Sequence, residues 1–292
     1  MQLLVSVASE DEAKSALEGG ADIIDAKDPQ VGSLGPVSRR TLAEIRTVVP
    51  ASIPLSAALG DVASSADVEV AFDLVIEPLQ FVKIGFRGVV EAGTVAALLG
   101  QSVTRAARLP GTPRLVAVGY ADFLRAGSLP PIAIAALAAR AGADGILVDT
   151  AFKDGGSLFE LLDLTQLTLL GSLLARHELC FAVGGSLGVP DFAGAHSVGA
   201  DIVGVRGRCV RRPAVRLGKR ELRPAASAGD QTAGHRAHPL SSAGSRSISP
   251  APITSHRSPS ASAFWKYGSV SSVPPATGLI STRRSAPRRL ER

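Results

Sequence analysis

Three lysines stand in or just after apolar, β-branched runs of the kind that form buried strands. Lys27 follows "DIIDA", Lys83 lies within "FVKIGF", and Lys153 follows "GILVDT". Residues 1–209 hold only these lysines and Lys14, against twelve arginines, so this chain mostly uses arginine where any cation would serve. A lysine amine can lose its proton and attack a carbonyl carbon to form a Schiff base, whereas a guanidinium stays protonated. The three positions therefore indicate amine catalysis on a carbonyl compound.

Two aspartates accompany these lysines. Asp25 lies two residues before Lys27, and Asp149 lies four residues before Lys153. Each carboxylate can orient an ammonium group or relay a proton, and burial with a neighbouring cation lowers the pKa of a lysine toward neutral pH. The alternative is that these residues only form buried ion pairs. Arginine would serve equally well in such pairs, so the choice of lysine favours catalysis, with Lys27 placed to be the nucleophilic amine.

The lysines belong to a regular series of short apolar runs, which we interpret as strands. Eight runs begin at Leu3, Asp22, Ile53, Phe81, Arg114, Gly145, Leu179 and Asp201. Stretches of helix-like periodicity separate them, and the first helix is predicted to begin with a capping box of Ser9 and Glu12 and to end at Gly19-Gly20. A Gly-Ala-Asp repeat precedes three of the runs, where glycine suits a left-handed helix end and aspartate can bond the backbone of the turn.

Eight strands alternating with helices predict a (β/α)8 TIM-type barrel over residues 1–209. The alternative is a doubly wound open sheet, but no Gly-x-Gly-x-x-Gly follows the first run. Strand side chains alternate between the two faces, so Asp25, Lys27 and Lys83 should point inside the barrel. Catalytic groups of this fold lie at the carboxyl ends of the strands, and we therefore expect the three lysines and two aspartates to meet there.

A phosphate site is expected after the seventh and eighth runs, where this fold often binds phosphate. Gly184 and Gly185 allow close backbone approach, Ser186 adds a hydroxyl, and Arg206 with Gly207 follows the last run. The glycines alone are equally typical of a tight turn.

A second Gly-Ser-Leu-Gly, residues 32–35, is either another anion nest or a loop shaped by its glycines and Pro36. No His, Cys and Asp cluster has metal-ligand spacing. We expect neither a metal nor a cofactor.

Charge divides the chain near residue 209. Residues 1–209 carry 23 acidic against 16 basic side chains, whereas residues 210–292 carry 15 basic and 3 acidic ones. The basic pI of 9.6 is thus a property of the C-terminal part, whose proline, serine and arginine content predicts a disordered basic tail. The tail offers no good eighth helix. One hypothesis is a frameshift near Arg208, which reading the DNA in the other two frames would test.

Several features bear on location. Cys180 and Cys209 are predicted near opposite ends of consecutive strands, too far apart to bridge, so we expect reduced thiols in the cytoplasm. No apolar run is long enough to span a membrane. A nucleic-acid partner is not expected, because the predicted barrel is acidic, and a homo-oligomer is left open.

Residues 1 to about 209 resemble (5-formylfuran-3-yl)methyl phosphate synthase, the furan-forming enzyme family of methanofuran biosynthesis. The resemblance is carried by "LLVSV", "GGADIIDAKDPQVGSLG", "FVKIGF", "GILVDTAFKDGGSLFE" and "FAVGGSLG…GADIVGVRG". It implies a (β/α)8 barrel that condenses two molecules of glyceraldehyde 3-phosphate, with loss of water and one phosphate. By the same resemblance Lys27 forms the Schiff base and Lys83 accepts a proton, while Lys153, Asp25 and Asp149 assist.

Three functions follow from these expectations. The first is a Schiff-base-forming carbon-oxygen lyase with a small phosphorylated triose as substrate. The second is a class I aldolase or another triose-phosphate enzyme that uses the same lysines. The third is a non-catalytic protein that binds nucleic acid through residues 210–292, which salt-dependent binding lost on truncation at Cys209 would reveal.

Overall fold

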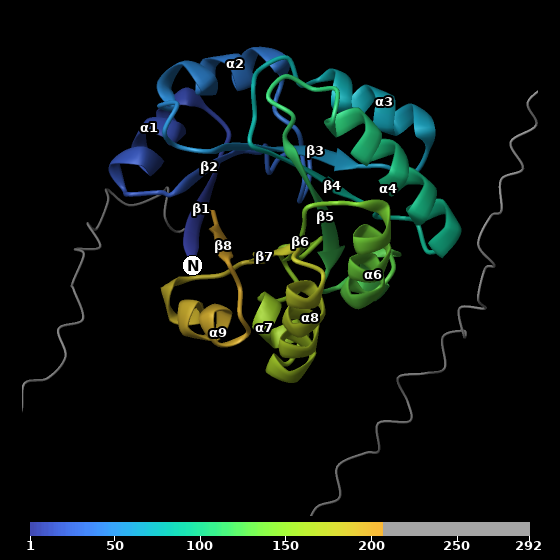
Figure 1. Ribbon diagram of the computed structural model, residues 1–292. Helices are drawn as coiled ribbons and strands as arrows, with labels where there is room; N and C mark the ends of the chain where they lie inside the picture. Colours follow the sequence, from blue (N-terminus) through green and yellow to red (C-terminus); the bar gives the residue numbers. More distant parts are fainter. Residues whose placement is uncertain (207–292) are drawn as a thin grey trace, which may run out of the picture. The chain divides into compact units, whose positions relative to one another are not determined.

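The computed structural model describes residues 1–206, in which eight parallel strands close into a barrel in the order β1 to β8 (Figure 1). The strands are β1 (Gln2–Val7), β2 (Ile23–Ala26), β3 (Leu55–Asp61), β4 (Phe81–Gly85), β5 (Arg114–Tyr120), β6 (Gly145–Asp149), β7 (Cys180–Val183) and β8 (Ile202–Val205). All eight predicted runs form strands, and the predicted TIM-type barrel is confirmed. The open-sheet alternative is wrong, because β8 pairs with β1.

Helices lie around the outside of the ring (Figure 1). They are α1 (Glu10–Glu18), α2 (Arg39–Val48), α3 (Ser65–Asp73), α4 (Ala92–Ala106), α5 (Phe123–Ala126), α6 (Pro131–Ala141), α7 (Leu158–Leu161), α8 (Leu164–Arg176) and α9 (Phe192–Ser197), with the 3-10 turn η1 (Val189–Asp191) before α9. Within residues 1–206, none of these helices has both the length and the hydropathy to cross a bilayer. The expectations for Gly207, Cys209, an eighth helix and the tail 210–292 lie outside the described residues.

The start of α1 follows its predicted signal with one difference. The hydroxyl of Ser9 accepts a hydrogen bond from the N–H of Glu12 at 3.2 Å, as expected for an N-cap. The Glu12 carboxylate, however, accepts from the N–H of Ala8 at 2.7 Å and not from that of Ser9. The second hydrogen bond of the capping box therefore comes from the residue before the N-cap. It places the Glu12 carboxylate next to the end of β1.

The Gly-Ala-Asp repeat has the predicted left-handed glycines but a different use for its aspartates. Gly20, Gly142 and Gly199 have φ values of 85°, 80° and 79°. Each aspartate accepts a hydrogen bond from the second residue of the strand preceding its own, in the pairs Asp22–Leu3, Asp144–Leu115 and Asp201–Phe181, at 2.8 to 2.9 Å. The expectation that these carboxylates bond their own turn is wrong. They join the start of one strand to the turn before the next.

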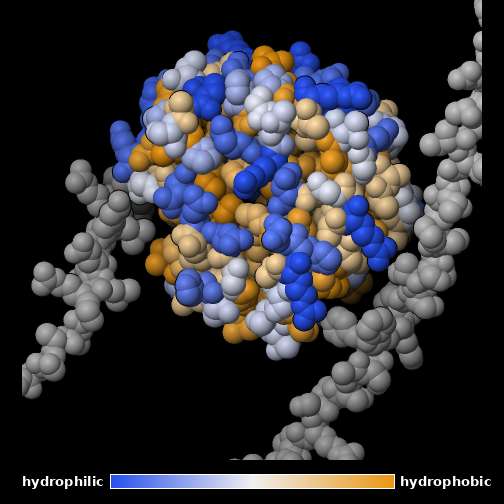
Figure 2. Space-filling model, viewed as in Figure 1, coloured by the Kyte–Doolittle hydropathy of each residue, from blue (hydrophilic) through white to orange (hydrophobic). Residues whose placement is uncertain are grey.

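Alternation along the strands separates two apolar layers. On β2, Ile24 and Ala26 pack outward in the large core between barrel and helices, while Ile23 packs inward. The inward layer includes Leu4, Ile23, Val116, Leu147 and Ile202. Figure 2 shows hydrophilic side chains gathered around the centre of the face in view. The apolar inner layer thus supports polar groups nearer the carboxyl ends of the strands.

Candidate active site

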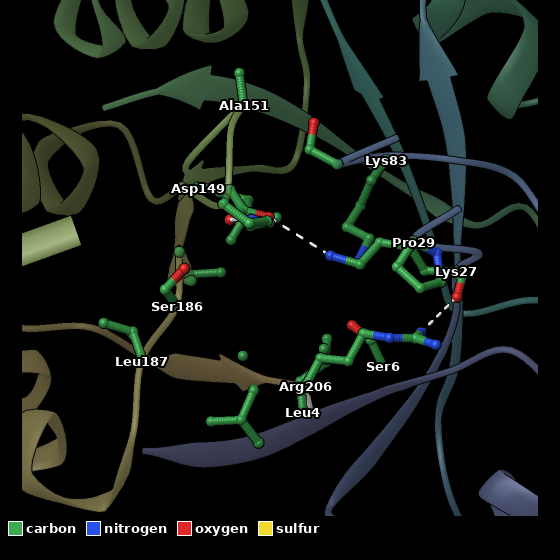
Figure 3. A pocket seen from close by; sticks show the side chains of 18 of the residues that line it. Leu4, Ser6, Lys27, Pro29, Lys83, Asp149, Ala151, Ser186, Leu187 and Arg206 are labelled. Carbon is green, nitrogen blue, oxygen red and sulfur yellow. Dashed lines mark hydrogen bonds and ion pairs between the residues drawn. The ribbon is translucent and has the colours of Figure 1, made fainter. Parts of the chain in front are cut away.

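A cavity of about 1680 Å³ runs along the inside of the barrel and opens at the carboxyl ends of the strands. Ligand pockets usually measure about 300–1,000 Å³, so this one has room for more than one small substrate. Lys27, Lys83, Lys153 and Asp149 line it, and Asp25 lies beneath with its side chain fully buried. The structure therefore brings together all five side chains that the sequence placed at the mouth of the barrel. Figure 3 shows three of them, Lys27, Lys83 and Asp149.

Lys83 and Asp25 form the deepest ion pair. Lys83 Nζ lies 2.6 Å from Asp25 Oδ2, which also accepts from the hydroxyl of Ser6 at 2.8 Å. Burial raises the pKa of Asp25, but the cations Lys83 and Lys27 outweigh it and the net pKa is lowered, so this carboxylate stays ionised. Burial also lowers the pKa of Lys83, and Lys27 adds to this effect against the opposing pull of Asp25. A lowered pKa favours the uncharged amine, which is the form of Lys83 that could accept a proton.

Asp149 joins the other two lysines. Its Oδ2 lies 3.5 Å from Lys27 Nζ, and its Oδ1 accepts from Lys153 Nζ at 2.9 Å. Lys153 also donates to the carbonyl and hydroxyl oxygens of Thr150 at 2.9 and 3.0 Å, which fixes an otherwise half-exposed side chain. Burial raises the pKa of Asp149, but the fields of Lys27 and Lys153 dominate and lower it to about 2.

The cluster places three lysines around two carboxylates whose pKa values are both lowered. Lys83 is the lysine whose pKa is lowered, by burial and by the neighbouring Lys27. A lysine amine that has lost its proton is a nucleophile toward carbonyl carbon.

The turn after β7 holds its backbone close to Asp149 and Thr150. Gly185 has φ of 99°, and a Cβ on it would lie 2.9 Å from Thr150 Cγ2, so glycine is required for both conformation and space. Ser186 is exposed and also left-handed, with φ of 58°. In Figure 3 it lies beside Asp149 and across the cavity from Lys27. Gly184, Gly185 and Ser186 all line the cavity, so the predicted phosphate-binding residues on this turn reach it.

Arg206 has a structural bond that the sequence did not suggest. Its Nη1 donates to the backbone carbonyl oxygen of Lys27 at 2.6 Å (Figure 3). Its Nη2 lies 3.4 Å from Glu12 Oε2. The side chain lines the cavity but joins the ends of β8 and β2. Arginine has five N–H donors, and those not used here remain available to an anion. Gly207, the other predicted group on this strand, lies outside the described residues.

Sequence reasoning missed a second polar network on the β3, β4 and β5 side. Tyr120 donates its hydroxyl to Asp61 Oδ1 at 2.6 Å, and Ser33 approaches the same hydroxyl at 3.4 Å. Arg87 contacts Asp61 through its backbone N–H and its Nε. Asp61 ends its strand just as Asp149 does, and that parallel was a usable signal. Among the described residues no group of three His, Cys, Asp or Glu side chains can hold a metal ion.

Comparison with known proteins identifies the relatives of this barrel. The 4-HFC-P synthase family model matches residues 3–220. The chain belongs to the 4-HFC-P synthase family. Its relatives include (5-formylfuran-3-yl)methyl phosphate synthase of Methanothermobacter thermautotrophicus, 35% identical over 71% of this chain and 88% of the relative. The enzyme of that name from Methanopyrus kandleri is 38% identical over 72% of this chain and 90% of the relative.

Solved structures share the fold of this 4-HFC-P synthase family member. One is 2,3-dimethylmalate lyase, a PEP mutase/isocitrate lyase superfamily member, with a TM-score of 0.51, 16% identity, and coverage of 70% of this chain and 75% of that one. At this identity the likeness concerns the fold alone.

Proposed function

We propose that this chain is a (5-formylfuran-3-yl)methyl phosphate synthase of methanofuran biosynthesis, a lyase that condenses two molecules of glyceraldehyde 3-phosphate. The observation that carries the proposal is the approach of Lys27 Nζ to Asp149 at 3.5 Å inside the cavity, with the Lys83–Asp25 pair beside it. Membership of the 4-HFC-P synthase family supports the named reaction. No cofactor is required by this chemistry.

The first step uses the amine of Lys27. The uncharged Nζ attacks the aldehyde carbon of one triose phosphate, a C–N bond forms, and the carbonyl oxygen leaves as water. The resulting iminium is positively charged next to Asp149, whose lowered pKa keeps its carboxylate ionised. Lys153, bonded to the same carboxylate at 2.9 Å, holds it in place.

The second step uses Lys83 as the proton acceptor. The iminium withdraws electrons, so the hydrogen on the adjacent carbon becomes acidic and passes to the Lys83 amine, leaving an enamine. The enamine electrons then expel the phosphate from the next carbon, whose C–O bond breaks with its electron pair. Asp25, 2.6 Å from Lys83, stabilises the ammonium that has formed.

The second triose phosphate supplies the remaining carbons. Lys83 gives its proton to the departing phosphate and is again a free amine, which takes the hydrogen on the carbon next to the second aldehyde and leaves an enolate. The enolate carbon attacks the terminal carbon of the unsaturated iminium on Lys27, so the new C–C bond forms as the electrons of the C=C bond return to the nitrogen as an enamine. Ring closure and hydrolysis from Lys27 complete a six-carbon furan that keeps one phosphate. In total, two triose phosphates give the furan phosphate, one inorganic phosphate and two molecules of water.

The test is incubation of the purified chain with glyceraldehyde 3-phosphate. A furan aldehyde absorbs in the near ultraviolet, so we expect rising absorbance with one phosphate released for every two trioses consumed. A class I aldolase, the alternative for the same lysines, would form the C–C bond without this absorbance or phosphate release. Consumption of triose with neither signal would overturn the proposal.

A matched pair of variants ties the signal to the site. Lys27→Arg keeps the charge but removes the nucleophile, so furan formation should disappear. Lys14→Arg changes an exposed lysine that is paired with Glu10 on α1, and it should leave the rate unchanged. The cytoplasmic location and the lack of a nucleic-acid partner stay predictions, and the binding alternative rests on residues outside the described part of the chain.

A further inference from the structure

Condensation of two triose phosphates brings two phosphate groups into one cavity, and the product keeps only one of them. The turns after β7 and β8 offer a place for one phosphate. Among the described residues that line the cavity, two are arginines, Arg87 and Arg206. Arg87 follows β4 and Arg206 follows β8, and these strands are opposite one another in a closed ring of eight. The cavity therefore has an arginine on each of two opposite sides.

Asp61 contacts Arg87 at the backbone and at Nε, and not at the terminal nitrogens. The N–H of Arg87 donates to Asp61 Oδ1 at 3.0 Å, and its Nε lies 3.7 Å from Asp61 Oδ2. Within residues 1–206, neither Nη atom of Arg87 has an acceptor, and the side chain is 44% exposed where it lines the cavity. With Nε turned toward Asp61 in this ion pair, the terminal N–H groups form the fork that suits phosphate oxygens.

A hydrogen-bonded network lies behind Arg87. Tyr120 is buried and donates to Asp61 at 2.6 Å, and burial, with Asp61 nearby, raises the pKa of this phenol so that it stays a donor. The network fits only because position 85 is glycine. A Cβ on Gly85 would lie 2.3 Å from Asp61 Oδ1 and 2.6 Å from the Tyr120 hydroxyl. Ser33 contacts the same hydroxyl at 3.4 Å and lines the cavity, so its loop joins the network that contacts Arg87.

We propose that Arg87, with the Ser33 loop of this network, forms a second phosphate subsite. It holds the phosphate of the triose that is not bonded to Lys27, which is the phosphate retained in the product. The assignment follows from Arg206, which contacts the Lys27 backbone at 2.6 Å and so marks the side of the first triose. This inference rests on the proposed function and names which substrate each side of the cavity takes.

Arg87→Gln separates the two half-reactions. Borohydride trapping of one triose phosphate on Lys27 should match the unaltered protein, because the first triose does not need Arg87. Furan formation at limiting substrate should fall about 10- to 150-fold, the usual effect of losing hydrogen bonds to a charged group. Binding of the furan phosphate product should weaken by a similar factor, and Arg87→Lys should restore part of both. Arg108→Gln, at an exposed arginine that does not line the cavity, serves as the control and should change neither.

The outcomes distinguish this subsite from the reaction itself. If the unaltered protein forms neither adduct nor furan, the proposed function fails. If it forms both, and Arg87→Gln lowers adduct and furan equally or lowers neither, the subsite is refuted. Circular dichroism and melting temperature check the fold of Arg87→Gln. Should that variant not fold, the decision passes to Arg87→Lys, whose trapped adduct must stay unchanged while product binding weakens.

Discussion

The amine of Lys83 and the carboxylate of Asp25 lie 2.6 Å apart with 4% and 0% of their side chains exposed. A buried pair of this kind rarely stabilises a fold better than apolar side chains of similar volume would. Burial and the neighbouring Lys27 lower the pKa of Lys83, although Asp25 opposes this effect. Lys83 therefore loses its proton more readily than an exposed lysine does. In the proposed reaction this pair supplies a base deep inside the barrel.

Replacement of Lys83 should separate Schiff-base formation from the steps that follow it. Lys83→Met fills similar volume but cannot accept a proton, so furan formation should fall by about 10²- to 10⁴-fold, the range for a lost general base. Borohydride trapping of substrate on Lys27 should persist. Loss of both signals in a folded Lys83→Met protein would show that Lys83 acts earlier than proposed.

The stability of the barrel should depend on pH through Asp149. The pKa of this carboxyl is about 2 in the folded protein against 3.8 for a free aspartate, because the lysine fields outweigh the burial that would raise it. A lowered folded pKa gives stability that is present above pH 4 and lost as pH falls toward 2. The shift corresponds to about 2 kcal/mol of unfolding free energy.

Urea denaturation between pH 5 and pH 2 measures this contribution. Asp149→Asn should lose less stability over that interval than the unaltered protein does. Asp11→Asn, at a side chain that is 95% exposed, is the control and should keep the original pH dependence. Identical pH dependence in Asp149→Asn and the unaltered protein would contradict the lowered pKa.

Arg125 of α5 contacts the loop that carries Lys153. Arg125 bonds Asp154 at 2.6 and 3.0 Å, and its guanidinium lies 3.9 Å from the centre of the Phe152 ring. Arg125→Ala should lower kcat several-fold, because Lys153 loses a fixed position, while the melting temperature changes little for so exposed an ion pair. Arg40→Ala removes a comparable exposed pair with Glu44 on α2 and should leave kcat unchanged. Equal kcat in the two variants would show that Arg125 does not position the Lys153 loop.

Asp144 tests the bond that joins consecutive strands. Its Oδ2 accepts from the N–H of Leu115 at 2.8 Å, so Asp144→Ala leaves that donor without its acceptor. The expected loss is about 1–3 kcal/mol of unfolding free energy. Asp144→Asn keeps an oxygen acceptor and should lose less. Thermal denaturation compares the two, and equal losses would show that the carboxylate charge matters and not the hydrogen bond.

The barrel and the convergence of the lysines could be predicted because both depend on short-range rules. Alternation along a strand fixes which residues face inward, and the carboxyl ends of parallel strands meet at one mouth. Asp25, Lys27 and Lys83 follow these rules directly. The Gly-Ala-Asp repeat likewise predicted left-handed glycines, because a φ near 80° favours a residue without Cβ.

The missed parts depend on partners that no local pattern specifies. The Asp61–Tyr120 bond joins residues 59 positions apart, and the Arg206–Lys27 bond spans 179 positions. From the sequence, an arginine after β8 could bind phosphate or form a hydrogen bond to the end of β2. The hydrogen bond from Ala8 N–H to Glu12 could not be predicted for a related reason. A capping box predicts that the Glu12 carboxylate is an acceptor, but not which of two adjacent N–H groups donates to it.

The covalent bond between Lys27 and substrate is the central step of the proposed reaction. Borohydride added during turnover of glyceraldehyde 3-phosphate, followed by peptide mass spectrometry, locates that bond. We predict a single modified lysine, Lys27, with Lys14 unmodified as the internal control, and no adduct in Lys27→Arg. Modification of Lys14 alone, or an undiminished adduct in Lys27→Arg, would contradict the account.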